Sequence, residues 1–216
     1  IPNNFLLVPE LILKNNKKLK ASSGIDAIAQ ALESMISLKS NSKSLLYASN
    51  SLKINLKNYI NYLKKPNKHN SSSMLFGAML AGKAINISKT TAPHAISYPF
   101  TSIYKISHGH AVSLTLEKFL KFNFLNNNKS VSNFNLKKRY EEIFKLFGVK
   151  NIFELEHEIK LIKKIAGLED NYKKLGININ TSYNKIISGV NLLRLKNNPI
   201  KIEKKDLKLI LLNKFQ

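Results

Sequence analysis

The chain contains no cysteine, and this absence excludes both disulfide bonds and metal sites built on thiolates. It also lacks any apolar run near the roughly 20 residues that a membrane-spanning helix needs, so we expect no membrane partner. The first residues, IPNNFLLVPELILKNNKKLK, have no basic segment before the apolar part and no small-residue cleavage site after it. We therefore expect no secretory signal peptide. Together these absences favour a cytoplasmic protein.

Arginine and acidic residues are also scarce. Lysine and arginine total 35 against 13 aspartates and glutamates, a net charge of +22, yet the only arginines are Arg139 and Arg194. A nucleic-acid-binding surface usually concentrates arginine and aromatic residues on one face, whereas the lysines here are scattered over every segment. We therefore expect a solvated basic surface and no nucleic-acid partner, although the charge would raise the local concentration of an anionic substrate.

Glycine is sparse as well. The eight glycines are dispersed, and no strand, glycine-rich loop and helix follow one another as a dinucleotide-binding unit requires. Hydrophobic residues make up 44% of the chain, which is typical of a globular protein. In residues 24–38 the apolar side chains recur on one helical stripe, and Ser23 followed by Asp26 is typical of a helix N-terminus. The prediction is one all-α domain, a helical bundle spanning residues 1–216.

Other segments show the same helical periodicity. Further helices are predicted over residues 44–63, 73–87, 136–147, 152–165, 181–190 and 204–215, and one is predicted to begin near His108. The segment 73–87 is apolar on nearly all sides, so we expect it in the centre of the domain. Residues 3–13 are a strand candidate, and the asparagine-rich residues 123–135 are expected to form a flexible connection.

Four polar residues have the spacing of a metal site. Asp26 and Gln30 are four positions apart, so both project from one helix face. His94 follows a proline that can start a helix, and His108 precedes a glycine. Carboxylate and imidazole groups bind divalent metals such as Fe²⁺ or Zn²⁺, and a catalytic metal needs three or four protein ligands and one open position. The spacing alone leaves a second interpretation open, a capping aspartate and two histidines in ordinary hydrogen bonds.

The motifs SSGIDAIAQALES, GAMLAGKAI, PHAISYP and ISHGHAVSL occur in this order. Nearly from end to end, the chain resembles the C-terminal domain of the iron-containing (group III) alcohol dehydrogenase family. The resemblance implies a helical bundle of the dehydroquinate synthase-like type, with Asp26, His94 and His108 as metal ligands. Gln30 stands where most members have a histidine ligand. Tyr98 stands where many members have another histidine near the substrate.

The resemblance also implies an activity, the NAD(P)H-dependent reduction of an aldehyde to an alcohol at Fe²⁺ (or Zn²⁺). DAIAQALES together with TTAPHAISYPFT and HGHAV is similar to the subgroup that converts phosphonoacetaldehyde, which is anionic, into 2-hydroxyethylphosphonate. Tyr98 and His110 are the predicted substrate-binding residues. Family members hold NAD(P) in an N-terminal nucleotide-binding domain, and nothing in this sequence resembles it. That domain is an expected partner, the isolated chain is expected to be inactive, and a homo-oligomer stays open.

Other polar residues are expected outside the site, and other functions remain as alternatives. His69 and His157 are expected at the surface, and Glu33 as a solvated carboxylate rather than a partner of the metal site. Lys105 is expected in solvent rather than on an anionic group. The alternatives to the subgroup are a generic group III alcohol or diol dehydrogenase, an inactive fragment that serves only in oligomerisation, and a basic nucleic-acid-binding bundle.

Overall fold

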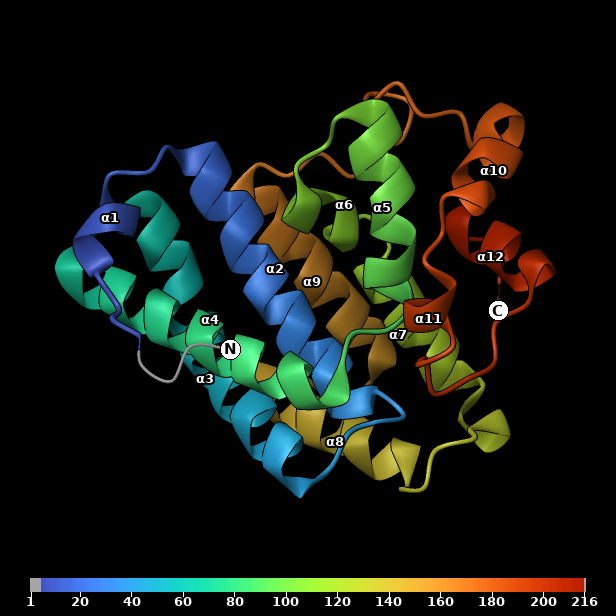
Figure 1. The fold of residues 1–216 in the computed structure, drawn as a ribbon, viewed down its shortest axis with the longest axis horizontal. Helices are drawn as coiled ribbons and strands as arrows, with labels where there is room; N and C mark the ends of the chain where they lie inside the picture. Colours follow the sequence, from blue (N-terminus) through green and yellow to red (C-terminus); the bar gives the residue numbers. More distant parts are fainter. Residues whose placement is uncertain (1–4, 216) are drawn as a thin grey trace.

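The computed structural model describes residues 5–215, which form helices joined by short loops (Figure 1). The helices are α1 (Pro9–Leu13), α2 (Lys17–Ile36), α3 (Ser42–Lys64), α4 (Lys68–Ser88), α5 (Ala92–Tyr104), α6 (His108–Ser113), α7 (Leu116–Leu125), α8 (Leu136–Phe147), α9 (Ile152–Ala166), α10 (Ile179–Ser188), α11 (Leu192–Leu195) and α12 (Lys204–Leu211). A short 3₁₀ helix, η1 (Asn127–Lys129), follows α7. Since residues 5–215 contain no strand, the predicted all-α class is confirmed.

Helix α2 lies in the middle of the bundle, against α3, α4 and α6 (Figure 1). It begins at Lys17, because the Asn16 side chain accepts a hydrogen bond from the Leu19 backbone N–H at 2.8 Å. The predicted cap at Ser23 is therefore wrong: Ser23 lies inside the helix, and its hydroxyl donates to the Leu19 carbonyl. Asp26 is consequently an interior residue of α2 and no cap.

Helix α4 was expected in the centre of the domain, and this expectation is wrong. Gly77 packs so closely on α3 that a Cβ atom at this position would lie 2.1 Å from the Asn55 Oδ1 atom. On the other side of the helix, Phe76, Gly82 and Lys83 are exposed. The small residues of α4 thus serve the close approach of two helices rather than complete burial.

Helix α3 and the helix expected from His108 onward also differ from the prediction. Residues 44–63 belong to one continuous helix, α3, whose N-terminus is capped by reciprocal hydrogen bonds between Asn41 and Ser44. The single helix expected from His108 onward is divided into α6 and α7 by a turn at Leu114 and Thr115. The turn lets α6 point toward α2 while α7 packs on α9.

The strand candidate and the flexible connection also need correction. Residues 9–13 form α1, whose first position is a proline, a residue well suited to start a helix; residues 3 and 4 lie outside the described part. Residues 123–135 begin within α7, where the amide side chains of Asn123 and Asn198 exchange hydrogen bonds of 3.0 and 2.8 Å. Val131 donates from its backbone to the Pro199 carbonyl at 3.1 Å, so this connection is anchored to the C-terminal segment.

The C-terminal helices cover one end of the bundle. Helices α10 and α11 pack on α5, and α12 packs on α7 and α10 (Figure 1). This arrangement brings the loop around α11 next to the N-terminal part of α5, where His94 lies. Within residues 5–215, every helix is too short or too polar to cross a lipid bilayer.

Candidate metal centre

Asp26 of α2, His94 of α5 and His108 of α6 meet at one point in the structure. Each offers a ligand atom, and these atoms all lie within 4.8 Å of one another. The Asp26 Oδ1 atom is 3.4 Å from His94 Nε2 and 3.8 Å from His108 Nε2. One carboxylate and two imidazoles, gathered from three helices, form the ligand set that a catalytic Fe²⁺ or Zn²⁺ requires.

The local sequence explains how the two histidines reach Asp26. Pro93 stands in the first turn of α5, so His94 emerges at the buried start of that helix. His108 is the first residue of α6, and Gly109 after it packs against α2. A Cβ atom on Gly109 would lie 1.9 Å from the Ser22 carbonyl oxygen, so only glycine allows α6 to come this close.

Two buried atoms of the cluster have no hydrogen-bonding partner. Within residues 5–215, Asp26 Oδ1 and His94 Nε2 are buried, face each other and meet no group in hydrogen-bond geometry. Leaving such atoms unsatisfied costs about 1–3 kcal/mol each, and a divalent cation would satisfy both. The cluster therefore fits a divalent metal, and Asp26, an interior residue of α2, is no capping aspartate.

Gln30 touches this cluster through Asp26. Its side-chain nitrogen donates a hydrogen bond of 2.8 Å to Asp26 Oδ2, the carboxylate oxygen that does not face the histidines. The contact holds the carboxylate with Oδ1 turned toward His94 and His108. Direct ligation of the metal by the Gln30 oxygen stays a prediction.

Glu33 was expected in solvent, and the structure contradicts this. The side chain is completely buried, and its Oε1 atom contacts His94 Nδ1. Its Oε2 atom accepts hydrogen bonds from the Thr91 backbone N–H at 2.6 Å and from the Thr91 hydroxyl at 2.9 Å. A carboxylate on one imidazole nitrogen fixes the ring so that the other nitrogen faces the metal. The signal was in the spacing, because Glu33 lies about two helical turns after Asp26, on the same face of α2.

The pKa values of the two histidines move in opposite directions. Burial disfavours the protonated form of His94, but the negative charges of Glu33 and Asp26 outweigh it and raise its pKa to about 9. For His108, burial dominates and the positive charges of His94 and Arg194 add to it, so its pKa is lowered despite Asp26. A metal that binds His94 Nε2 must therefore compete with a proton for this nitrogen.

Replacing Glu33 with glutamine should lower the affinity for Zn²⁺ by about 10- to 100-fold, because the neutral amide orients His94 less well and makes it a weaker ligand. The affinity can be measured by titration of the 216-residue chain against a fluorescent chelator. Glu141→Gln, on the exposed side of α8, is the matched control and should leave the affinity unchanged. Equal affinities of the Glu33 variant and the original chain would show that Glu33 has no part in the site.

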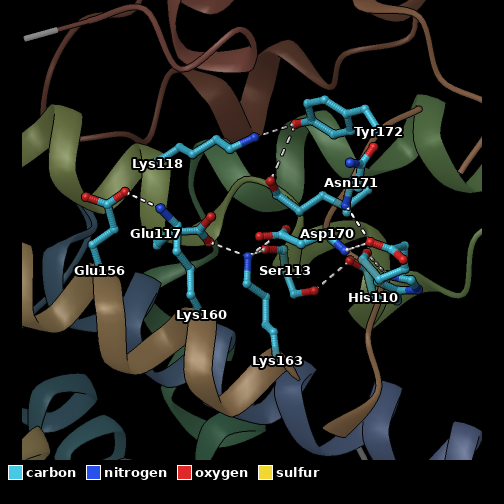
Figure 2. A network of polar contacts seen from close by, with 12 residues as sticks. His110, Ser113, Glu117, Lys118, Glu156, Lys160, Lys163, Asp170, Asn171 and Tyr172 are labelled. Carbon is cyan, nitrogen blue, oxygen red and sulfur yellow. Dashed lines mark hydrogen bonds and ion pairs between the residues drawn. The ribbon is translucent and has the colours of Figure 1, made fainter. Parts of the chain in front are cut away.

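The predicted substrate residues lie at different places. Tyr98 is one helical turn after His94, its ring centroid is 6.4 Å from that of His108, and it is 38% exposed, so a small molecule at the cluster can reach it. His110 is not part of the cluster, and its Nε2 atom donates to the Glu169 carbonyl at 2.6 Å (Figure 2). A substrate role for either residue stays a prediction. His69 and His157 are exposed, on α4 and α9, and Lys105 is exposed after α5.

Comparison with known families agrees with this geometry. The model of the Fe-containing alcohol dehydrogenase family, C-terminal, matches residues 20–215. The chain belongs to the iron-containing alcohol dehydrogenase family. Asp26, His94 and His108, which gather at one point in the structure, all lie within the matched residues.

Two curated family relatives and one solved structure show how far the likeness extends. Phosphonoacetaldehyde reductase of Streptomyces viridochromogenes is 28% identical over 123 residues, which is 56% of this chain and 31% of that protein. NAD-dependent methanol dehydrogenase of Bacillus methanolicus is 25% identical over 182 residues, which is 82% of this chain and 44% of that protein. Sulfoacetaldehyde reductase of Bifidobacterium kashiwanohense, solved with NAD⁺, superposes with a TM-score of 0.82 at 26% identity, over 95% of this chain and 52% of that one. The chain thus spans about half or less of these proteins.

Proposed function

We propose that the chain is the metal- and substrate-binding part of an NAD(P)H-dependent oxidoreductase that reduces an aldehyde to an alcohol, with phosphonoacetaldehyde as the substrate. The observation that carries the proposal is the convergence of Asp26, His94 and His108, with two buried ligand atoms that lack partners. Membership of the iron-containing alcohol dehydrogenase family supports the reaction class. The likeness to a phosphonoacetaldehyde reductase and a sulfoacetaldehyde reductase supports the anionic substrate.

The residues of the site have separate tasks in this proposal. A divalent metal held by Asp26, His94 and His108 would polarise an aldehyde oxygen and favour hydride addition at its carbon. Glu33 fixes the orientation of His94, and Gln30 fixes that of Asp26. The Tyr98 side chain is partly exposed beside His108, where its hydroxyl would donate a hydrogen bond to a substrate oxygen.

The hydride donor is assigned to a part of the enzyme other than this chain. The sequence contains no glycine-rich phosphate-binding loop. Residues 5–215 also contain no strand, which an α/β nucleotide-binding unit requires. We therefore propose that a nucleotide-binding domain supplies NAD(P)H, and that the 216-residue chain alone does not catalyse hydride transfer. Substantial NAD(P)H-dependent aldehyde reduction by the purified chain would contradict this.

A second candidate is a generic group III alcohol dehydrogenase that acts on neutral substrates. The likeness to the methanol dehydrogenase favours it, because that protein matches more of this chain than the phosphonoacetaldehyde reductase does. The two candidates differ in the ratio of kcat/KM for phosphonoacetaldehyde to that for acetaldehyde, measured on a complete enzyme that contains this chain. We expect a ratio well above 10. A ratio at or below 1 would favour the generic dehydrogenase, and no activity on any aldehyde would favour an inactive chain that serves in oligomerisation.

A further inference from the structure

Arg194 of α11 lies beside the metal cluster. Its guanidinium carbon is 5.7 Å from the centroid of the Tyr98 ring, and that ring is in turn 6.4 Å from the ring of His108. The side chain is half-buried, and the Tyr98 ring and the His108 side chain next to it are partly exposed. A small molecule that reaches the cluster from this side therefore passes the guanidinium.

The position of Arg194 is set by hydrogen bonds at both ends of α11. The Asn191 side chain accepts from the Arg194 backbone N–H at 3.1 Å, while the Asn191 backbone donates to the Ala95 carbonyl of α5 at 3.1 Å. After the helix, the Asn197 side chain donates to the Thr90 carbonyl at 3.0 Å. The guanidinium itself donates to the Thr90 hydroxyl. The arginine is thus presented on a fixed support that is joined to the start of α5.

The positive charge of Arg194 is not neutralised by a carboxylate. Within residues 5–215, no aspartate or glutamate lies within ion-pair distance of this guanidinium, whereas Arg139, the other arginine, pairs with Glu142 at 3.8 Å. A guanidinium has five N–H donors in a rigid fork, and the described contacts of Arg194 use one nitrogen, toward Thr90. The remaining donors are available for an acceptor with two or more oxygens.

We propose that Arg194 binds the anionic oxyacid group of a short aldehyde substrate whose carbonyl oxygen lies at the Asp26–His94–His108 centre. The inference rests on the proposed function and names the residue that would select the substrate. A guanidinium matches two oxygens of a phosphonate, sulfonate or carboxylate with paired, charge-assisted hydrogen bonds. Tyr98 lies between Arg194 and His108, so its ring would contact the carbon chain that joins the two ends of the substrate.

The test uses the 216-residue chain loaded with Zn²⁺ and calorimetric titration with alcohols of the product type. The probes are 2-hydroxyethylphosphonate, 2-hydroxyethanesulfonate, 3-hydroxypropanoate and, as the neutral match, 1,2-ethanediol. We expect at least one anionic probe to bind roughly tenfold or more tightly than the neutral one, the size of one hydrogen bond to a charged group. Arg194→Gln should abolish this preference. Arg194→Lys, which keeps the charge without the fork, should retain part of it.

Arg139→Gln is the matched control, since it removes the other arginine, which lies on α8 and pairs with Glu142, and it should leave all affinities unchanged. Which anion binds most tightly identifies the oxyacid group. If the chain binds Zn²⁺ but the anionic probes bind no better than 1,2-ethanediol, or bind the Arg194→Gln variant as tightly as the original chain, the inference is wrong and the proposed metal site stands. If the folded chain binds no Zn²⁺, the proposed function fails, and the inference fails with it.

Discussion

His94→Ala is expected to lower the affinity of the chain for Zn²⁺ or Fe²⁺ by more than about 100-fold. Residues that only orient a metal ligand already contribute about 10- to 100-fold, and His94 is placed as a ligand itself. Its removal leaves Asp26 and His108, too few for a catalytic metal site. It also leaves the buried Glu33 carboxylate without its imidazole partner.

The measurement is metal content after dialysis, together with competition against a chelator, for the original chain and for His94→Ala and His108→Ala. His157→Ala is the control, because this histidine is exposed on α9. Each of the first two variants should lose stoichiometric metal, while the control should keep it. Full metal binding by His94→Ala would mean that the ion is bound elsewhere and that the cluster has been misassigned.

Lys163→Met is expected to lower the free energy of unfolding by about 3–5 kcal/mol, the usual consequence of removing one partner of a buried ion pair. Lys163 of α9 is almost completely buried, and its ammonium group donates to Glu117 Oε2 at 2.8 Å, to Asp170 Oδ1 at 2.7 Å and to the Ser113 carbonyl at 3.1 Å (Figure 2). Glu117 is equally buried, so its charge would be left without compensation. In a chain of this size the loss corresponds to a fall in Tm of roughly 10 °C.

Urea denaturation followed by circular dichroism can measure this difference. Lys160→Met is the matched control: Lys160 is one turn away, partly exposed, and pairs with Glu156, and such pairs contribute less than about 1 kcal/mol. The double variant Lys163→Met, Glu117→Met should recover part of the stability, because both buried charges are then removed. A Lys163 variant as stable as the Lys160 variant would show that the network contributes little to folding.

The helices themselves could be predicted from local sequence, because burial of one apolar face imposes the same spacing whatever the rest of the chain does. Residues 136–147 form α8 with the predicted bounds, and residues 152–165 differ from α9 only at the last position. The start of α2 was predicted wrongly because several residues near it could each cap a helix. In a chain rich in asparagine and serine many positions resemble caps, and the choice of Asn16 over Ser23 depends on how far α2 packs against its neighbours.

The three candidate ligands were expected from the family motifs, and the structure brings their side chains together, while their binding of a metal stays a prediction. Glu33 was misplaced because its spacing from Asp26 indicates a shared helix face but does not say whether that face is covered. Its burial depends on Thr91 and His94, which belong to another helix. A carboxylate in the sequence is usually solvated, and here its contacts across the bundle decide otherwise.

Arg194 shows the limit of sequence reasoning most clearly. Nothing near it in the sequence resembles a substrate site, and it is far along the chain from His94 and His108. Packing of α11 on α5 brings it beside Tyr98, and the hydrogen bonds of Asn191 keep it there. The all-α class and the candidate ligands were thus predictable from residue patterns, because they depend on periodicity and on the chemistry of single side chains. The orienting carboxylate and the unpaired arginine emerged from contacts between distant segments, which depend on how the helices pack.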